Sequence, residues 1–258
     1  MDGGVTRRTL SSLSEAQAFI DAISRAGSSH DLDLLLEQIS REMGFAYHAL
    51  VHHVDHRIAD PNMVRLENYP ENWVGTFLEK ELYSWDPVVL ASQATSAAFA
   101  WSDVPRLIQM TNRQRDVLKA AAGEGLGDGF TVPAHMPGQV SGSCTFVVRT
   151  GLVLPQHHRA MVQLVGSFAF QVGRSLALAE NGAAPSPRVT LTPRQLDCIV
   201  LAGRGKSDWE IAQILGLKED TVTEYLDAAR ARYGVARRIQ LVMRAVHDGY
   251  VALSDVIE

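Results

Sequence analysis

The chain has 258 residues, of which 46% are hydrophobic and 21% are charged, so it is long enough for one or two domains with cores of their own. Its two cysteines, Cys144 and Cys198, are too few and too far apart for a disulfide framework or a cysteine zinc site. The net charge of −5 excludes a strongly basic chain, and from Arg188 onward ten basic and ten acidic residues balance each other.

The sequence also carries information about where the protein resides. Residues 1–4 do not begin an apolar stretch of the kind that signal peptides carry. No run approaches the roughly 18 apolar residues that a membrane span needs. Together with the cysteine usage, these features predict a cytoplasmic protein with no membrane partner.

Helix and strand patterns mix over the first two-thirds of the chain. Residues 34–43 have the apolar spacing of a helix. Three segments have the composition of strands, namely 46–54, 130–136 and 144–149. Between the last two strands, Pro137, Gly138 and Gln139 predict a hairpin turn.

A long helix is predicted after Pro155, since the apolar residues that follow keep a helical spacing until about Glu180. This helix and the three strands together predict an α+β protein whose N-terminal part is an α/β/α sandwich around an antiparallel sheet. Residues 181–187 contain one glycine and two prolines and predict a linker. We therefore expect a first domain over 1–180, a linker over 181–188 and a second domain over 189–258.

The second domain is predicted to be entirely helical. Thr192 to Gln195 and Ser207 to Glu210 are capping boxes, and each begins a helix. Gly216 is typical of a helix end, and a third helix is predicted over 219–233, with a fourth beyond it. Two short helices joined by a tight turn form a helix-turn-helix, which binds DNA. A small helical bundle that only packs or dimerises has the same pattern.

Five short stretches of this segment are distinctive: Leu191-Thr192-Pro193-Arg194-Gln195, Gly205-Lys206-Ser207, Glu210-Ile211-Ala212, Leu215-Gly216 and Thr221-Val222. In residues and spacing they resemble the LuxR-type helix-turn-helix. The resemblance implies a four-helix unit that binds double-stranded DNA. Three positions depart from the family: Gln195 stands for the usual Glu, Ile199 for Leu, and Thr223 for Lys or Arg. The helix that would enter the major groove also carries several acidic residues, which repel phosphates.

The residues that we expect to contact DNA lie in and around that helix. Acidic side chains can accept a hydrogen bond from cytosine, and basic ones contact phosphates. The candidates are Arg204, Lys206, Lys218, Asp220, Thr221, Thr223, Glu224 and Arg230, with Arg232, Arg237 and Arg238 as further phosphate contacts. A solvated charged surface is the alternative interpretation for the basic residues.

Aromatic and acidic residues of the first domain form a second candidate site. Trp73 and Phe77 share one face of a helix that begins at Pro70, and such a pair is common in cores. Asp86 precedes Pro87, which by itself predicts a helix N-cap with proline at the first helical position.

The order and spacing of six residues resemble the autoinducer-binding domain of the LuxR family. These are Tyr69, Trp73, Asp86, Pro87, Trp101 and Gly129. The resemblance implies a pocket for an N-acyl-homoserine lactone, a small signal rather than a cofactor. An ionised Asp86 only accepts hydrogen bonds, so it suits the amide N–H of that ligand. Phe77 replaces the usual Tyr and makes the wall more apolar, which leaves the acyl-chain preference open.

The other ligand contacts implied by the resemblance follow from donor chemistry. Trp73 would donate to the lactone carbonyl and Tyr69 to the acyl carbonyl. Trp101 would form a wall for the lactone ring, and Thr145 matches a hydroxyl position of the family. We add Thr131, on the strand that follows Gly129.

A regulator of this type has further expected partners. We expect a homodimer that uses the long helix after Pro155 and the fourth helix of the second domain, with RNA polymerase as a candidate partner. A two-fold dimer predicts a palindromic operator with half-sites about one helical turn apart. Whether the ligand promotes DNA binding or release stays open.

Two alternatives to the lactone sensor remain. One is the same scaffold responding to a different small molecule. The other is a metal-dependent sensor or enzyme that uses His48, His52, His53 and His56. On a strand, His48 and His52 face one side and His53 the other, so we favour a solvated strand end and expect no enzyme.

Overall fold

The computed structural model describes residues 3–54, 62–137, 139–182 and 189–257, with side chains described from residue 13 onward. The chain divides into two compact units, one formed by Met1–His135 with Val140–Ala184 and the other by Pro185–Glu258 with Met136–Gln139. Across the described part of the chain, no helix has the length and apolar character to cross a membrane.

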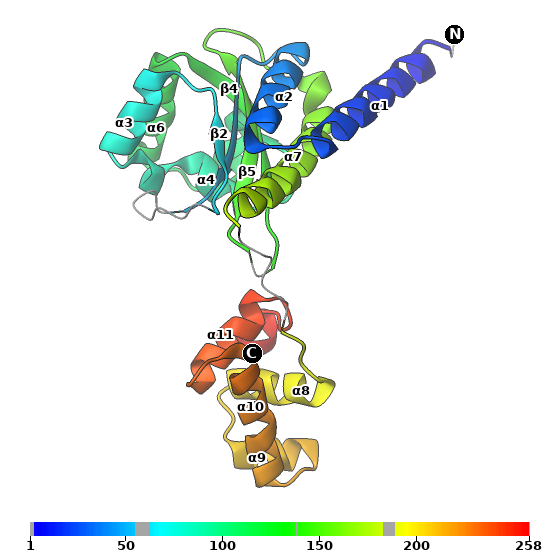
Figure 1. The fold of residues 1–258 in the computed structure, drawn as a ribbon. Coiled ribbons are helices and arrows are strands. Elements are labelled where there is room, and N and C mark those ends of the chain that lie inside the picture. The colour runs from blue at the N-terminus through cyan, green and yellow to red at the C-terminus, as the bar shows by residue number, and fades with distance from the viewer. Residues whose placement is uncertain (1–2, 55–61, 138, 183–188, 258) are drawn as a thin grey trace. The chain divides into compact units, whose positions relative to one another are not determined.

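The first unit is built on a five-stranded antiparallel sheet with the order β2-β1-β5-β4-β3 (Figure 1). The strands are β1 (Tyr47–His52), β2 (Arg65–Glu67), β3 (Phe99–Ala100), β4 (Leu126–Ala134) and β5 (Gly142–Arg149). The three predicted strands are confirmed as β1, β4 and β5. The short edge strands β2 and β3 complete the sheet, so the antiparallel prediction is confirmed.

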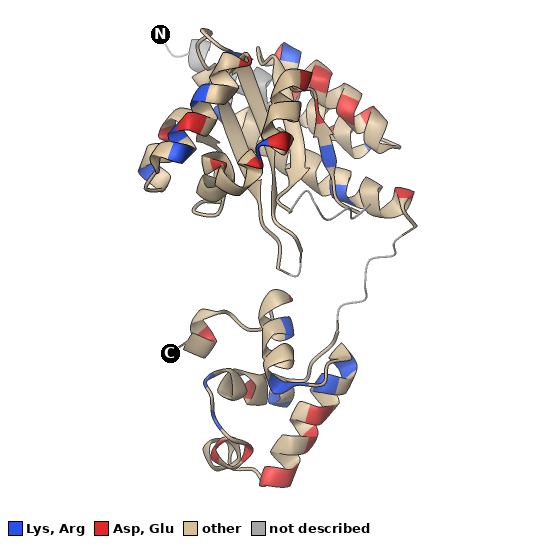
Figure 2. Ribbon diagram, turned by 90° about the vertical axis from the view of Figure 1, so that its left-hand side faces the viewer, with Lys and Arg blue, Asp and Glu red and all other residues tan. Residues whose placement is uncertain are grey.

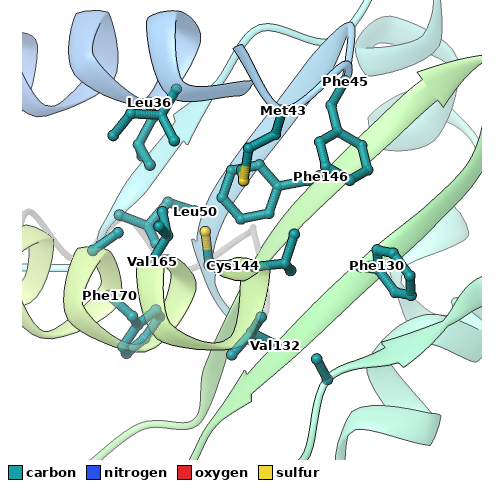
Figure 3. Close-up of a cluster of buried hydrophobic side chains, with 14 of the residues drawn as sticks. Leu36, Met43, Phe45, Leu50, Phe130, Val132, Cys144, Phe146, Val165 and Phe170 are labelled. Atoms are coloured by element: carbon teal, nitrogen blue, oxygen red, sulfur yellow. The ribbon is translucent and has the colours of Figure 1, made fainter. Parts of the chain in front are cut away.

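One face of the sheet packs against three helices, α1 (Gly3–Ser24), α2 (Ser29–Glu42) and α7 (Arg159–Glu180). Alternate residues of β5, Cys144, Phe146 and Val148, point into this core because side chains alternate along a strand. Figure 3 shows Phe146 beside Phe45, and their ring centroids lie 5.8 Å apart. Helix α7 approaches closely at Gly166, where an added Cβ would lie 2.7 Å from Val132 and 3.2 Å from the Cβ of Cys144.

The opposite face carries α3 (Glu71–Glu79), α4 (Pro87–Ser92), α5 (Val104–Leu107) and α6 (Asn112–Gly123), and this pair of layers confirms the α/β/α sandwich. The 3-10 helices are η1 (Leu82–Trp85), η2 (Trp101–Asp103) and η3 (Gln156–His158). Two apolar clusters lie on this side, one around Trp73 and Val147 and one around Val88 and Phe99. Trp101 packs against both clusters.

The second unit is helical, as predicted. It contains α8 (Pro193–Gly203), α9 (Asp208–Leu215), α10 (Glu219–Tyr233) and α11 (Arg238–His247), followed by the short α12 (Ser254–Ile257). Both capping boxes are present, since Thr192 and Ser207 accept from the N–H groups of Gln195 and Glu210 at 3.3 Å. Gly216 ends α9 with a φ of +64°, a conformation that glycine adopts without strain.

Candidate functional site

A cavity of about 330 Å³ lies between the sheet and the helices α3, α4 and α6. Six of the residues that we singled out for the ligand line it together: Tyr69, Trp73, Phe77, Asp86, Trp101 and Thr145. They come from five different elements or loops spread over 77 positions of the chain, so the fold collects them. The volume is at the small end for a ligand pocket.

The aromatic wall of the cavity is set by the first turns of α3. Trp73 and Phe77 lie one turn apart, with ring centroids 5.4 Å apart. Tyr69 precedes the helix and packs edge-on against Tyr47. No described residue accepts a hydrogen bond from the indole N–H of Trp73 or the hydroxyl of Tyr69. Burial raises the pKa of Tyr69 well above its ordinary value, so its hydroxyl keeps its proton as a donor.

Asp86 lines this cavity and also caps helix α4. Its Oδ1 accepts from the N–H of Val88 at 2.8 Å, so it is the N-cap of α4, with Pro87 at the first helical position. The N-cap interpretation is thereby confirmed. Burial raises its pKa from 3.8 to about 6, although hydrogen bonds from the Val88 and Val89 backbone oppose the shift. The carboxylate is thus ionised at neutral pH while most of its hydration has been lost.

A hydrogen-bonded row supports the other wall. The indole N–H of Trp101 donates to Thr131 at 3.0 Å, and the hydroxyls of Thr131 and Thr145 lie 3.0 Å apart. Thr131 and Thr145 are paired across β4 and β5. Thr131 is fully buried and is not among the residues that line the cavity. The structure therefore places Thr131 behind Trp101 and Thr145, where it fixes their orientation.

Several polar residues also line the cavity and were missed from the sequence. They are His53, Arg65, Glu67, Tyr83, Ser84, Gln93 and Ser143. The Nε2 of His53 lies 2.9 Å from the hydroxyl of Ser143, and Arg65 pairs with Glu67 at 2.7 Å. The period-two pattern of β5 held a signal for Ser143, since it shares a face with Thr145.

The histidines of the first strand are buried, so the expectation of a solvated strand end is wrong. His48 and His52 are 1% and 4% exposed; His48 contacts Asp33 of α2 and the ring of His52 packs against Phe170 of α7. His52 and His53 both contribute to the lining of the cavity. His48 contacts Asp33 at 2.8 Å, and His52 accepts from the N–H of Val64 at 2.8 Å. His56 lies outside the described residues. Within the described ranges, no three metal-binding side chains gather.

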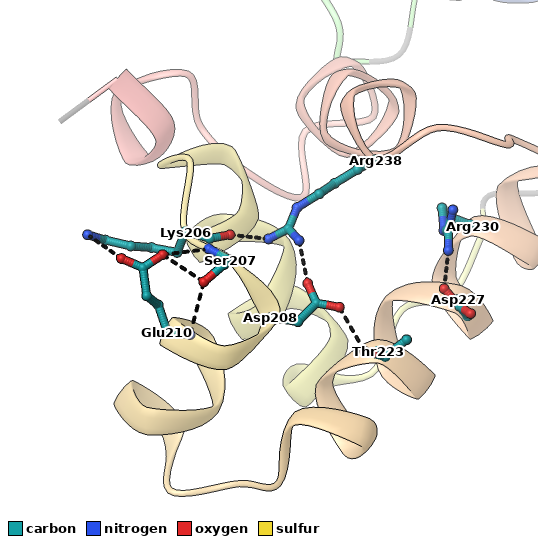
Figure 4. Close-up of polar contacts among 8 residues, drawn as sticks. All are labelled: Lys206, Ser207, Asp208, Glu210, Thr223, Asp227, Arg230 and Arg238. Atoms are coloured by element: carbon teal, nitrogen blue, oxygen red, sulfur yellow. Dashed lines mark hydrogen bonds and ion pairs between the residues drawn. The ribbon is translucent and has the colours of Figure 1, made fainter.

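In the second unit, one carboxylate joins three helices (Figure 4). Asp208, at the start of α9, accepts from the hydroxyl of Thr223 on α10 at 2.8 Å and pairs with Arg238 at the start of α11. Arg238 also donates to the carbonyl of Lys206. The hydrogen bond between Thr223 and Asp208 therefore links the two helices α9 and α10.

The DNA-contact candidates fall into two groups. Lys218, Asp220, Thr223 and Glu224 are exposed, and Thr221 is half-buried, around the first turns of α10. In contrast, Arg204 donates to the carbonyl of Asp255 at 2.7 Å, and Arg230 donates to that of Ala236 at 2.8 Å. Figure 2 shows acidic residues along the first turns of α10 and basic ones toward its end. Lys206 pairs loosely with Glu210 at 3.9 Å.

Comparison with known proteins gives consistent matches for both units. Residues 28–172 match the autoinducer binding domain, and residues 189–245 match the bacterial regulatory proteins of the luxR family. The transcriptional activator protein LuxR of Aliivibrio fischeri is 25% identical over 91% of this chain and 94% of its own. The quorum sensing-dependent regulator RpaR of Rhodopseudomonas palustris is 27% identical over 92% and 95%. Among solved structures, Escherichia coli SdiA superposes with a TM-score of 0.63 at 20% identity, covering 92% of this chain and 98% of SdiA.

Proposed function

Because the chain belongs to the LuxR family of bacterial regulatory proteins, we propose that it senses an N-acyl-homoserine lactone and binds a palindromic operator as a homodimer. The family is one of transcriptional regulators and not of enzymes. The observation that carries the ligand proposal is the cavity of the first unit, where a dehydrated carboxylate, two donors with no acceptor among the described residues and aromatic walls converge.

The polar head of such a lactone matches the groups around the cavity. Asp86 accepts from the amide N–H, Trp73 donates to the lactone carbonyl, and Tyr69 donates to the acyl carbonyl. Trp101 and Phe77 cover the apolar surfaces, and Thr145 lies within the same cavity. Thr131 acts through Trp101 and Thr145 rather than by contact with the ligand.

DNA is proposed to bind at the exposed first turns of α10. In this proposal, base edges and phosphates are contacted by Lys218, Asp220, Thr221, Thr223 and Glu224, with Lys206, Arg204 and Arg230 at the flanks; the exposure of most of these side chains supports it. Dimerisation is supported by exposed apolar pairs one turn apart on two helices. These pairs are Leu164 with Phe168 on α7 and Ile239 with Met243 on α11. RNA polymerase is a further proposed partner, and the cytoplasm is the proposed location.

The proposed domains are the sensor over 1–180, the linker over 181–188 and the DNA-binding domain over 189–258. Ligand binding stabilises the sensor and shifts the population toward one dimer arrangement, to the extent that the ligand distinguishes the two states. The competing proposal on the same scaffold is a different small signal. It is favoured by the polar residues of the cavity, such as His53 and Glu67, which a purely fatty chain does not use.

Thermal unfolding against acyl-homoserine lactones of graded chain length tests the proposal. At a hundred times its dissociation constant, a ligand should raise the free energy of unfolding of the sensor by about 2.7 kcal/mol. For a unit of this size the melting temperature should rise by several degrees. If no lactone shifts the melt of folded protein that is free of bound ligand, the signal belongs to another chemical class.

Affinity for the lactone should depend on pH through Asp86. Below pH 6 this carboxyl becomes protonated and loses its charge as acceptor, so affinity should fall about tenfold between pH 7 and pH 5. Without ligand the trend is opposite: the folded state holds the proton more tightly than the unfolded chain. The contribution of Asp86 to the free energy of unfolding therefore decreases as pH rises from about 4 to about 6. Calorimetric titration at both pH values measures the first effect, and an affinity that stays constant would contradict it.

A further inference from the structure

The cavity has two polar regions, which lie at successive positions along the sheet. In the first, Glu67, Ala49, Thr145 and Thr131 stand in register across four strands, beside the head-group residues described above. Glu67, Tyr69 and Asp86 all line the cavity, and burial, with smaller electrostatic effects of the two carboxylates, raises the pKa of Tyr69. This region is where the amide and the lactone ring would bind.

The second region begins two residues further along the strands. Arg65, Val51 and Ser143 are in register there, about 7 Å from the first row, and His53 follows because its N–H donates to the carbonyl of Ser141. An acyl tail that leaves the first region along the sheet floor crosses this second row. We call His53 and Ser143 the tail-end pair.

The tail-end pair is largely withdrawn from water, since Ser143 is buried and His53 is half-buried. Ser143 is 4% exposed, and its hydroxyl contacts Nε2 of His53 at 2.9 Å. Burial, with a smaller effect from His135, lowers the pKa of His53 to about 4, so the ring is neutral at physiological pH. The Nδ1 of His53 lies 3.5 Å from Ser92, whose hydroxyl already donates to the carbonyl of Val89 at 2.6 Å.

Because each ring nitrogen of His53 has a hydroxyl within hydrogen-bond distance, the open hydrogen-bonding position of the pair lies on Ser143. A serine hydroxyl has one donor and two acceptor positions, so its contact with His53 leaves Ser143 at least one position open toward the cavity that it lines. A hydrocarbon tail in contact with this pair would shield the two polar side chains from water without forming a hydrogen bond to them, and this would lower the affinity for the ligand. The neighbouring lining residues Val88, Val89 and Val54 still provide an apolar path to it.

Resting on the proposed function, we infer that the signal is an acyl-homoserine lactone whose tail carries a hydroxyl group near its end, held by Ser143 and His53. A hydroxyl both donates and accepts, so it suits Ser143 whichever ring nitrogen of His53 carries the proton. The apolar body of the chain lies along the three valines. In this proposal, Ser143 and His53 are the residues that distinguish ligands with a hydroxylated tail from ligands with a purely hydrocarbon tail.

Matched ligand pairs test the inference on the full chain. Unsubstituted acyl-homoserine lactones of four, six and eight carbons are compared by calorimetry with the same compounds bearing a terminal hydroxyl. At the best chain length, the hydroxylated ligand should bind wild-type protein about tenfold more tightly, because it alone satisfies the pair. In Ser143→Ala and His53→Leu the preference should disappear or invert. The comparison is a ratio within each variant, so a change in overall stability cancels.

The control is Val89→Ala, which shortens a lining residue without changing a polar group. It should weaken both ligands of a pair equally and keep the tenfold ratio. If unsubstituted lactones bind wild-type protein as tightly as hydroxylated ones, the hydroxyl assignment is overturned while lactone sensing stands. If the preference survives in both Ser143→Ala and His53→Leu, the assignment to this pair is overturned. If neither ligand class binds, lactone sensing fails and the tail assignment fails with it.

Discussion

Asp86→Asn should reduce lactone affinity by about tenfold to a hundredfold, the largest expected effect of a single polar change in the sensor. A hydrogen bond to a buried charged group contributes about 1.5–3 kcal/mol. An asparagine side chain also presents an N–H₂ group to the ligand amide N–H in one of its two orientations, so the pairing is weakened further. The measurement is the dissociation constant by calorimetry, together with the ligand-induced shift of the melting temperature.

The same variant has an internal control in the helix that it caps. Asparagine is as good an N-cap as aspartate, so α4 should keep its first turn. The free energy of unfolding without ligand should stay the same or rise, because a buried carboxylate with a raised pKa is removed. Full lactone affinity in Asp86→Asn would contradict its place as the acceptor. A large loss of stability without ligand would show that the cap, and not the ligand, needs the charge.

Phe146→Ala should lower the free energy of unfolding of the sensor by about 3–5 kcal/mol. Phe146 is fully buried at the centre of the sheet and packs against Phe45 and the helices of the first layer. Truncation leaves a cavity that the sheet cannot close, since hydrogen bonds to β1 and β4 fix β5 on both sides. Urea unfolding followed by tryptophan fluorescence measures the effect, because Trp73, Trp85 and Trp101 report on this unit and Trp209 on the other.

Ile211→Ala is the matched variant in the second unit, where this side chain is fully buried at the core. It should destabilise that unit by about 2–5 kcal/mol and leave the sensor transition in place. Phe146→Ala should do the reverse. Parallel shifts of both transitions in either variant would contradict independent cores.

Local signals predicted the elements that they encode. The capping boxes at Thr192 and Ser207 fixed the starts of α8 and α9, and apolar periodicity predicted α7. The same kind of signal was available for α6, because Thr111 and Gln114 form a third capping box. Leu164 and Phe168 of α7 fit the helical apolar spacing as well as Met161 and Val165 do, but of these four only Met161 and Val165 are buried. Spacing identifies an apolar helix; it does not say how much of the apolar stripe the rest of the chain covers.

The composition of the candidate site depended on contacts between distant segments. The spacing of Tyr69, Trp73, Asp86 and Trp101 carried the family resemblance, and these residues do share one cavity. The histidines were misjudged because their partners come from elsewhere: Asp33 on α2 reaches His48, and the backbone of Val64 reaches His52. Thr131 was grouped with the ligand contacts because the sequence does not show that Trp101 lies in front of it.

Strand β5 separates the cavity of the first unit from helix α7 by the thickness of one polypeptide strand. Thr145 faces the cavity, whereas its two chain neighbours, Cys144 and Phe146, face the helical core, where Cys144 meets the close approach at Gly166. A molecule that contacts Thr145 in the cavity acts on the same peptide units of β5 against which α7 packs. A displacement of Thr145 by a bound molecule therefore reaches the proposed dimerisation helix through a few covalent bonds of β5. It does not need a series of side-chain contacts around the edge of the sheet.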